Sequence, residues 1–162
     1  MKFNIRPIAP SDCSPVTKLI QELAEFEKLS HLLETNAERL HEALFGHAQF
    51  LYGLVGTVEE NVVGYALYFR SYSTFIGKPG FYLEDLYVQP QFRGIGIGKS
   101  LLKSIANQAL QLDYRRFEWT VLDWNQPAIE FYQSIGARAL DEWKLYRLDK
   151  EKLEKFGAAG GT

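Results

Sequence analysis

The sequence predicts a mixed α/β fold with a twisted, mostly antiparallel sheet of about six to seven strands flanked by about four helices. Two observations predict it. Apolar, β-prone residues at 50–58 and 62–72, joined by a polar turn, indicate an antiparallel pair of strands. The strand–helix–strand order from Gly80 to Leu122 requires a crossover connection, which makes its two strands parallel. The sheet is therefore expected to be antiparallel first and partly parallel later.

The first half of the chain supplies one short strand and two helices. Residues 3–7 alternate apolar and polar side chains, as a strand does. Asp12 or Ser14 then caps a helix whose apolar residues recur at helical spacing. A second helix is predicted for 36–44, and Gly46 stops it.

The later elements follow in the order strand, helix, strand, helix and strand, over residues 80–89, 96–112, 117–122, 126–135 and 143–148. Pro90 ends the first of these strands, because proline lacks the N–H group that a sheet needs. Gly136 ends the second helix, since glycine adopts the left-handed backbone of a helix C-cap.

The length of 162 residues fits one domain, which we assign to residues 1–156. Residues 157–162 are small and low in complexity, and we expect a flexible tail there. The single cysteine, Cys13, excludes an internal disulfide and fits a reducing cytoplasm. No apolar stretch approaches the ~20 residues of a membrane helix, so no membrane partner is expected.

The net charge of −2 provides no basic field for nucleic acid, so a nucleic-acid partner is not expected either. A cationic substrate is compatible with this charge. The three histidines, His31, His41 and His47, show no metal-ligand spacing, and no metal is expected.

The most informative segment runs from Arg93 to Lys99 and contains three glycines at alternate positions. It follows a predicted strand and opens a predicted helix. Glycines let backbone N–H groups approach an anion, and a helix N-terminus favours negative charge. A turn alone needs only one glycine, so a phosphate cradle is the better interpretation. The spacing matches neither the ATP-binding P-loop nor the dinucleotide fingerprint.

The pattern Arg93-x-x-Gly96-x-Gly98 resembles the pyrophosphate loop of the GNAT acetyltransferase superfamily. The resemblance covers nearly the whole chain. It is greatest for the diamine branch, which contains the spermidine/spermine and the thialysine N-acetyltransferases. The segments that carry it, besides the loop, are Glu22–Leu29, Tyr82–Val88, Val121–Gln126 and Phe131–Tyr132.

The resemblance implies acetyl-CoA as co-substrate and a primary amine of a small molecule, such as a diamine, a polyamine or a thialysine-like compound, as acceptor. It also implies a homodimer. The residues it assigns to the coenzyme are Leu86, Tyr87, Val88, Arg93, Gly94, Ile95, Gly96, Ile97, Gly98, Lys99, Asn125 and Tyr132.

The resemblance further implies a catalytic pair, with Glu84 as the base and Tyr132 as the acid that protonates the departing thiolate. It assigns Asp85, Glu27 and Trp124 to the amine. The chemistry requires such groups, because an alkyl amine is protonated at neutral pH and has no lone pair until a base removes the proton.

The residues alone leave alternatives open at these positions. Glu84 and Asp85 are adjacent in a strand and point to opposite faces unless a bulge re-aims them, and they can be a solvated pair. Tyr132 can be a core residue and Asn125 a simple helix cap. The alternative functions are a protein N-terminal or lysine acetyltransferase and a catalytically idle acyl-CoA-binding module.

Overall fold

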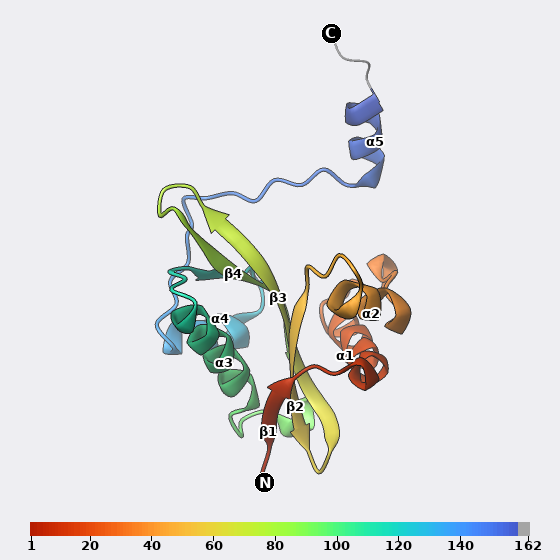
Figure 1. The fold of residues 1–162 in the computed structure, drawn as a ribbon, viewed down its shortest axis with the longest axis vertical. Coiled ribbons are helices and arrows are strands. Elements are labelled where there is room, and N and C mark those ends of the chain that lie inside the picture. Colours follow the sequence, from red (N-terminus) through yellow and green to blue (C-terminus); the bar gives the residue numbers. More distant parts are fainter. Residues whose placement is uncertain (159–162) are drawn as a thin grey trace. The chain divides into compact units, whose positions relative to one another are not determined.

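The sheet of this protein has five strands in the spatial order β1-β2-β3-β4-β5 (Figure 1). We describe residues 1–158 in a computed structural model. The strands are β1 (Asn4–Pro7), β2 (Tyr52–Val58), β3 (Asn61–Ser73), β4 (Lys78–Val88) and β5 (Phe117–Glu118).

Neighbouring strands pair antiparallel from β1 to β4, whereas β5 pairs parallel to β4 at Phe81↔Phe117 and Tyr82↔Glu118. A helical crossover connects β4 to β5, as a parallel pair requires. The mixed, mostly antiparallel sheet is therefore confirmed. Five strands are fewer than the six to seven that the sequence predicts.

The α-helices are α1 (Cys13–Phe26), α2 (Ala37–Phe45), α3 (Ile97–Gln111), α4 (Gln126–Ser134) and α5 (Lys150–Ala158). Three short 3₁₀ helices precede α1, α2 and α3 in turn: η1 (Pro10–Asp12), η2 (Ser30–Leu32) and η3 (Pro90–Phe92). Helices α1 and α2 lie on one side of the sheet, and α3 lies on the other (Figure 1). Two layers of helices thus bury both faces of the central strands.

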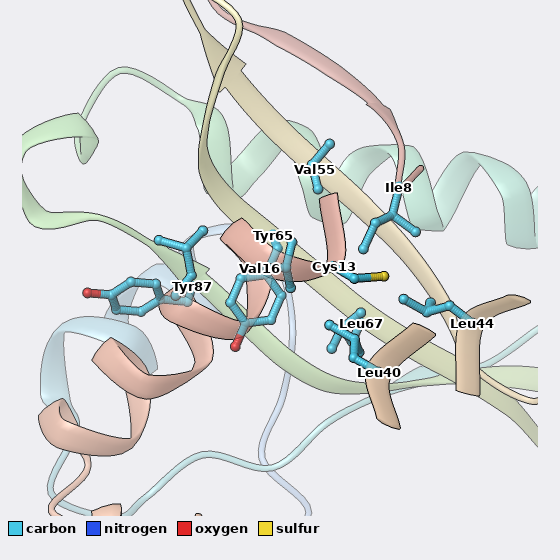
Figure 2. Close-up of a cluster of buried hydrophobic side chains, with 10 residues drawn as sticks. Ile8, Cys13, Val16, Leu40, Leu44, Val55, Tyr65, Leu67 and Tyr87 are labelled. Carbon is cyan, nitrogen blue, oxygen red and sulfur yellow. The ribbon is translucent and has the colours of Figure 1, made fainter. Parts of the chain in front are cut away.

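The core beneath α1 and α2 is a cluster of buried side chains from both helices and from the sheet (Figure 2). Aliphatic side chains fill most of it. Tyr65 and Tyr87 lie at one end, and their hydroxyl oxygens are turned away from the aliphatic groups (Figure 2). The cluster is therefore mainly aliphatic at one end. At the other end, near the C-terminus of α1, it carries the polar hydroxyls of the two tyrosines.

The chain forms two compact units, residues 1–120 and the residues from Val121 onward. The first contains the sheet with α1, α2 and α3. The second contains α4 and α5. Caps define the helix starts in both units: the side chain of Asn36 accepts a hydrogen bond from Arg39 N, and that of Asn125 accepts one from Ala128 N.

The final predicted strand, Trp143–Leu148, is wrong. The segment is extended and forms no ladder in the described part of the chain, and Trp143 and Tyr146 are 73% and 88% exposed. Its apolar character favours a strand, but a strand also needs a neighbour whose backbone groups are unpaired. The strand predicted at 117–122 is shorter in the structure, because β5 pairs with β4 over two residues only.

The number of helices and the start of the tail also differ from the prediction. The described residues contain five α-helices, whereas the sequence predicts about four. The helix that was not predicted is α5. Residues 157 and 158, assigned to the tail, are the last two residues of α5. Residues 159–162 lie outside the described residues.

Candidate active site

Strand β4 carries a β-bulge at Glu84. Leu83 pairs with Tyr68 and Asp85 pairs with Leu67, so Glu84 has no partner residue in β3. The bulge reverses the alternation of side chains along the strand. Tyr68 bonds to helix α3 whereas Leu67 belongs to the core under α1, so residues before and after the bulge face opposite layers. Asp85 is thereby placed on the α1 face.

Asp85 is half-buried beside the fully buried Tyr65, whose hydroxyl lies 3.5 Å from Oδ2 of the carboxylate. Burial raises the pKa of Asp85 from its ordinary value of 3.8 to about 7, and the negative charges of Glu84 and Glu27 act in the same direction. The hydrogen bond from Tyr65 opposes the rise. Asp85 can therefore exchange a proton, or gain a cationic partner, near neutral pH.

Glu27 follows the last residue of α1 and belongs to the same electrostatic group. Burial raises its pKa, and its charge contributes to raising the pKa values of both Asp85 and Tyr65. A bound cation would relieve this repulsion between carboxylates. Sequence reasoning thus selected Glu27, Glu84 and Asp85, which come together, but it missed Tyr65.

The glycine loop has the geometry of an anion cradle. Gly94 and Gly96 adopt left-handed backbone conformations, with φ of 78° and 100°. Gly96 is the N-cap of α3, and no side chain in the described residues caps this helix. The first N–H groups of a helix have no partner inside it, so they remain available to a ligand. Lys99 is exposed in the first turn and adds positive charge.

The start of α3 is anchored in the sheet by Ile97, which is 1% exposed. Gly56 of β2 and Gly64 of β3 are paired, and together they leave a notch for this side chain. A Cβ atom on Gly56 would lie 2.6 Å from Ile97 Cγ2, and one on Gly64 would lie 3.4 Å from it. Ile97 therefore holds the loop against the sheet, while Ile95 remains exposed.

Arg93 is tied to the end of β4. Its Nε donates to the carbonyl oxygen of Val88 at 2.8 Å. Its guanidinium carbon lies 5.6 Å from the ring centre of Phe26 and 5.5 Å from that of Tyr87. Such cation–π contacts fix the side chain between α1 and β4. Arg93 thus shapes the approach to the loop as well as contributing charge.

The segment Leu86–Val88 pairs with β3 on one edge only. Within residues 1–120, the parallel pairing with β5 ends at Tyr82, so no strand covers the other edge of Leu86–Val88. Uncovered strand groups are hydrogen-bonding sites for a chain that lies along them. An extended ligand with amide groups can pair along such an edge, which leads directly to the glycine loop.

The remaining predicted residues lie in the second unit. Asn125 caps α4 through its side chain. Trp124 precedes this cap. Tyr132 lies on α4 with its ring centre 5.5 Å from that of Phe131. The capping role of Asn125 is therefore confirmed, and Tyr132 is set on a regular helix.

Residues 1–158 contain neither a metal-binding cluster nor a membrane-spanning helix. No group of three or more histidine, cysteine, aspartate or glutamate side chains there could hold a metal ion. No helix in the same residues combines the length and the apolar character that crossing a bilayer demands.

The acetyltransferase (GNAT) family matches residues 16–137, a span that includes residues of both units. The chain belongs to the GNAT family. GNAT acetyltransferases use acetyl-CoA, and the uncapped glycine loop and the uncovered edge of β4 fit that co-substrate.

Two curated GNAT relatives extend along almost the whole chain. Thialysine N-epsilon-acetyltransferase of Mus musculus is 40% identical over 164 residues, which cover 94% of this chain and 96% of that protein. L-ornithine N5-acetyltransferase of Arabidopsis thaliana is 31% identical and covers 95% and 87%. The prediction of an acetyl-CoA-dependent amine N-acetyltransferase is thereby confirmed, as is the resemblance to the thialysine enzymes.

A solved structure supports the fold. AAC(6')-Iy in complex with the bisubstrate analogue CoA-S-monomethyl-acetylneamine superposes with a TM-score of 0.75 at 17% identity, over 92% of this chain and 99% of that one. At this identity the similarity concerns the fold alone.

Proposed function

We propose that this GNAT protein transfers the acetyl group of acetyl-CoA to the terminal primary amine of a short cationic small molecule, a thialysine-like amino acid or a diamine. One observation carries the proposal. The carboxylates of Glu27, Glu84 and Asp85 form one electrostatic group on and beside β4, the strand that ends at the glycine loop. The names of the two relatives agree, since thialysine and ornithine are both amino acids with a terminal amine.

The proposed roles of the acidic residues come from the resemblance to the diamine branch, and their placement supports these roles. Asp85 and Glu27 attract the ammonium group, and the exposed Glu84 takes its proton, directly or through water. The free amine then attacks the thioester carbon and the new C–N bond forms. The C–S bond breaks as the thiolate leaves, and the nitrogen loses its second proton to water. Trp124 is assigned to the amine through the resemblance to the diamine branch.

The coenzyme is assigned to the loop from Arg93 to Lys99 and to the segment Leu86–Val88, with Asn125 beside it by resemblance. Tyr132 is the proposed acid. Its phenol, whose ordinary pKa is near ~10, is matched to an alkyl thiol and can protonate the departing thiolate. The buried lone Cys13 is consistent with the reducing cytoplasm as its compartment.

A panel of amines tests this function, with release of free CoA as the readout. We expect kcat/KM to be highest for thialysine, ornithine and putrescine, lower for spermidine, and lowest for a short lysine peptide. The longer polycation is expected to be slower because thialysine and ornithine, the substrates named for the two relatives, are short amino acids with a terminal amine. Preference for the peptide would indicate a protein acetyltransferase. CoA binding without turnover of any amine would indicate an idle binding module.

We also propose that the protein is a homodimer. Trp143 and Tyr146 are large, exposed side chains on an extended segment without a ladder partner in the described residues, and a second copy can cover them. Light scattering is expected to give about 37 kDa, which is twice the chain mass of 18.6 kDa. Trp143→Ser is expected to shift the mass towards the monomer. A monomeric wild-type protein at micromolar concentration contradicts the proposal.

A further inference from the structure

The carboxylate of Glu22 on α1 lies at the end of β4, where the loop begins. The hydroxyl of Tyr87 donates to Glu22 Oε2 at 3.0 Å, and Nε2 of Gln89 donates to Glu22 Oε1 at 2.9 Å. Each carboxylate oxygen thus accepts a separate hydrogen bond from the strand side. Hydrogen bonds to an ionised acceptor are about twice as strong as neutral ones. Glu22 therefore fastens α1 to both residues that flank Val88.

Hydrogen bonds also hold the backbone between Gln89 and the glycine loop. Gln89 N donates to the carbonyl of Val63 at 3.0 Å, and the carbonyl of Gln89 accepts from Phe92 N at 2.9 Å. Gln89 is the N-cap of η3, which ends immediately before Arg93. Arg93 in turn donates back to the carbonyl of Val88. The position of Gln89 thus determines where η3 begins.

The ring of Tyr87 provides a second structural connection between Glu22 and Arg93. It is 6% exposed, and the guanidinium of Arg93 lies over it. The hydrogen bond from Tyr87 to Glu22 orients this ring. Both connections start at Glu22 and end at Arg93, the residue that precedes Gly94.

We propose that Glu22 is a positioning residue for acetyl-CoA, which holds the entry to the glycine loop in register with β4. The proposal rests on the proposed function, because it takes the loop to be the coenzyme site. Glu22 itself does not touch the coenzyme. It acts through Tyr87, Gln89 and Arg93.

The direction of the change in CoA affinity distinguishes a positioning role of Glu22 from a purely electrostatic one. Replacing Glu22 with Gln removes a negative charge close to a site for an anion. Coulomb's law alone then predicts tighter binding of CoA. Loss of positioning predicts weaker binding, because the loop N–H groups no longer converge before the ligand arrives. The two explanations give opposite results in one measurement.

The experiment is calorimetric titration of the full-length protein with CoA. For Glu22→Gln we expect about a tenfold rise in Kd, the effect of one lost hydrogen bond to a charged group. Tyr87→Phe is expected to raise Kd several-fold. The double variant is expected to bind no more weakly than Glu22→Gln, since both changes break the same contact. For Glu22→Gln at saturation with both substrates, kcat is expected to stay within about twofold of the wild type.

Two controls match the changes. Tyr68→Phe also removes a hydroxyl that joins a strand to a helix, its 2.7 Å bond to Gln108 on α3. Glu25→Gln removes an exposed carboxylate from the same helix as Glu22. Both are expected to leave the Kd for CoA unchanged. If Tyr68→Phe loses as much affinity for CoA as Tyr87→Phe does, Glu22 only stabilises the fold in general. That result would overturn the proposal.

The outcomes distinguish this proposal from the proposed function. If the wild-type protein binds CoA and Glu22→Gln binds it equally or more tightly, positioning by Glu22 is wrong and the function stands. If the wild-type protein gives no heat with CoA, both are overturned. Should Glu22→Gln fail to fold, Tyr87→Phe decides between the same outcomes.

Discussion

Tyr132→Phe is expected to lower kcat roughly 100-fold, the usual contribution of a positioned general acid. The phenylalanine keeps the ring and its packing against Phe131 but has no proton for the thiolate of CoA. The Kd for acetyl-CoA is expected to change by less than about twofold, because the lost interaction develops only as the C–S bond breaks. Steady-state rates and calorimetry together measure both quantities.

Tyr114→Phe is the matched control for this change. It also removes one phenolic hydroxyl, from a ring that packs against Phe81 at the far end of α3, and it is expected to retain full activity. Full activity of Tyr132→Phe would assign this tyrosine to packing alone. An equal loss of kcat and of coenzyme affinity would instead indicate a binding role.

Asp85→Asn is expected to abolish most of the activity and yet to stabilise the protein. The native carboxyl keeps its proton up to about pH 7, whereas the unfolded chain releases it near the ordinary value of 3.8. Between these values the native state binds more protons, so the free energy of unfolding of the wild type falls as the pH rises from about 4 to about 7. Asparagine removes this dependence. At pH 8 we expect the variant to be more stable by about 4 kcal/mol.

Urea unfolding at pH 5, 6 and 8 measures this effect. The difference between variant and wild type is expected to grow through this interval and to stay constant above about pH 7, where Asp85 is ionised in both states. A difference that does not change with pH would show that Asp85 is not the titrating group.

Glu84→Gln is the matched control, because it neutralises the adjacent carboxylate in an exposed position. Its effect on stability is expected to stay within about 0.5 kcal/mol. Its kcat/KM for the amine is expected to fall at pH 7 and to recover as the pH rises, since solvent then takes the proton. In the wild type, kcat/KM is expected to decline as Asp85 becomes protonated below about pH 7. Equal behaviour of the two variants would contradict their separate roles.

Much of the fold follows from local patterns. The cap Asn125, the left-handed Gly136 and the proline that ends β4 lie where they were expected. Asn36, expected as the first residue of its helix, is the N-cap of α2, and Asp12 pairs with Arg6 and makes no side-chain cap for α1. Each of the first three acts through its own backbone or through neighbours within a few residues, so the sequence alone is sufficient. The glycine loop belongs to the same class, because its left-handed residues precede the helix that they open.

The errors in the strands concern pairing between distant segments. Apolar residues at 143–148 favour a strand, yet a ladder also depends on a strand elsewhere in the fold whose edge is free. The length of β5 is limited in the same way, because only Phe81 and Tyr82 pair with it. No local pattern records which edge is free.

By itself, the sequence determined the order of the elements, the anion-binding turn and the residue types available for amine acetylation, because these depend on neighbours along the chain. The tertiary structure decided which side of the sheet each carboxylate faces. The register between β3 and β4 leaves Glu84 unpaired and directs Asp85 towards Tyr65 and Glu27, and the packing of α1 brings Glu22 to Tyr87 and Gln89. Such proximities arise between residues far apart in the chain, and burial then sets their proton affinities.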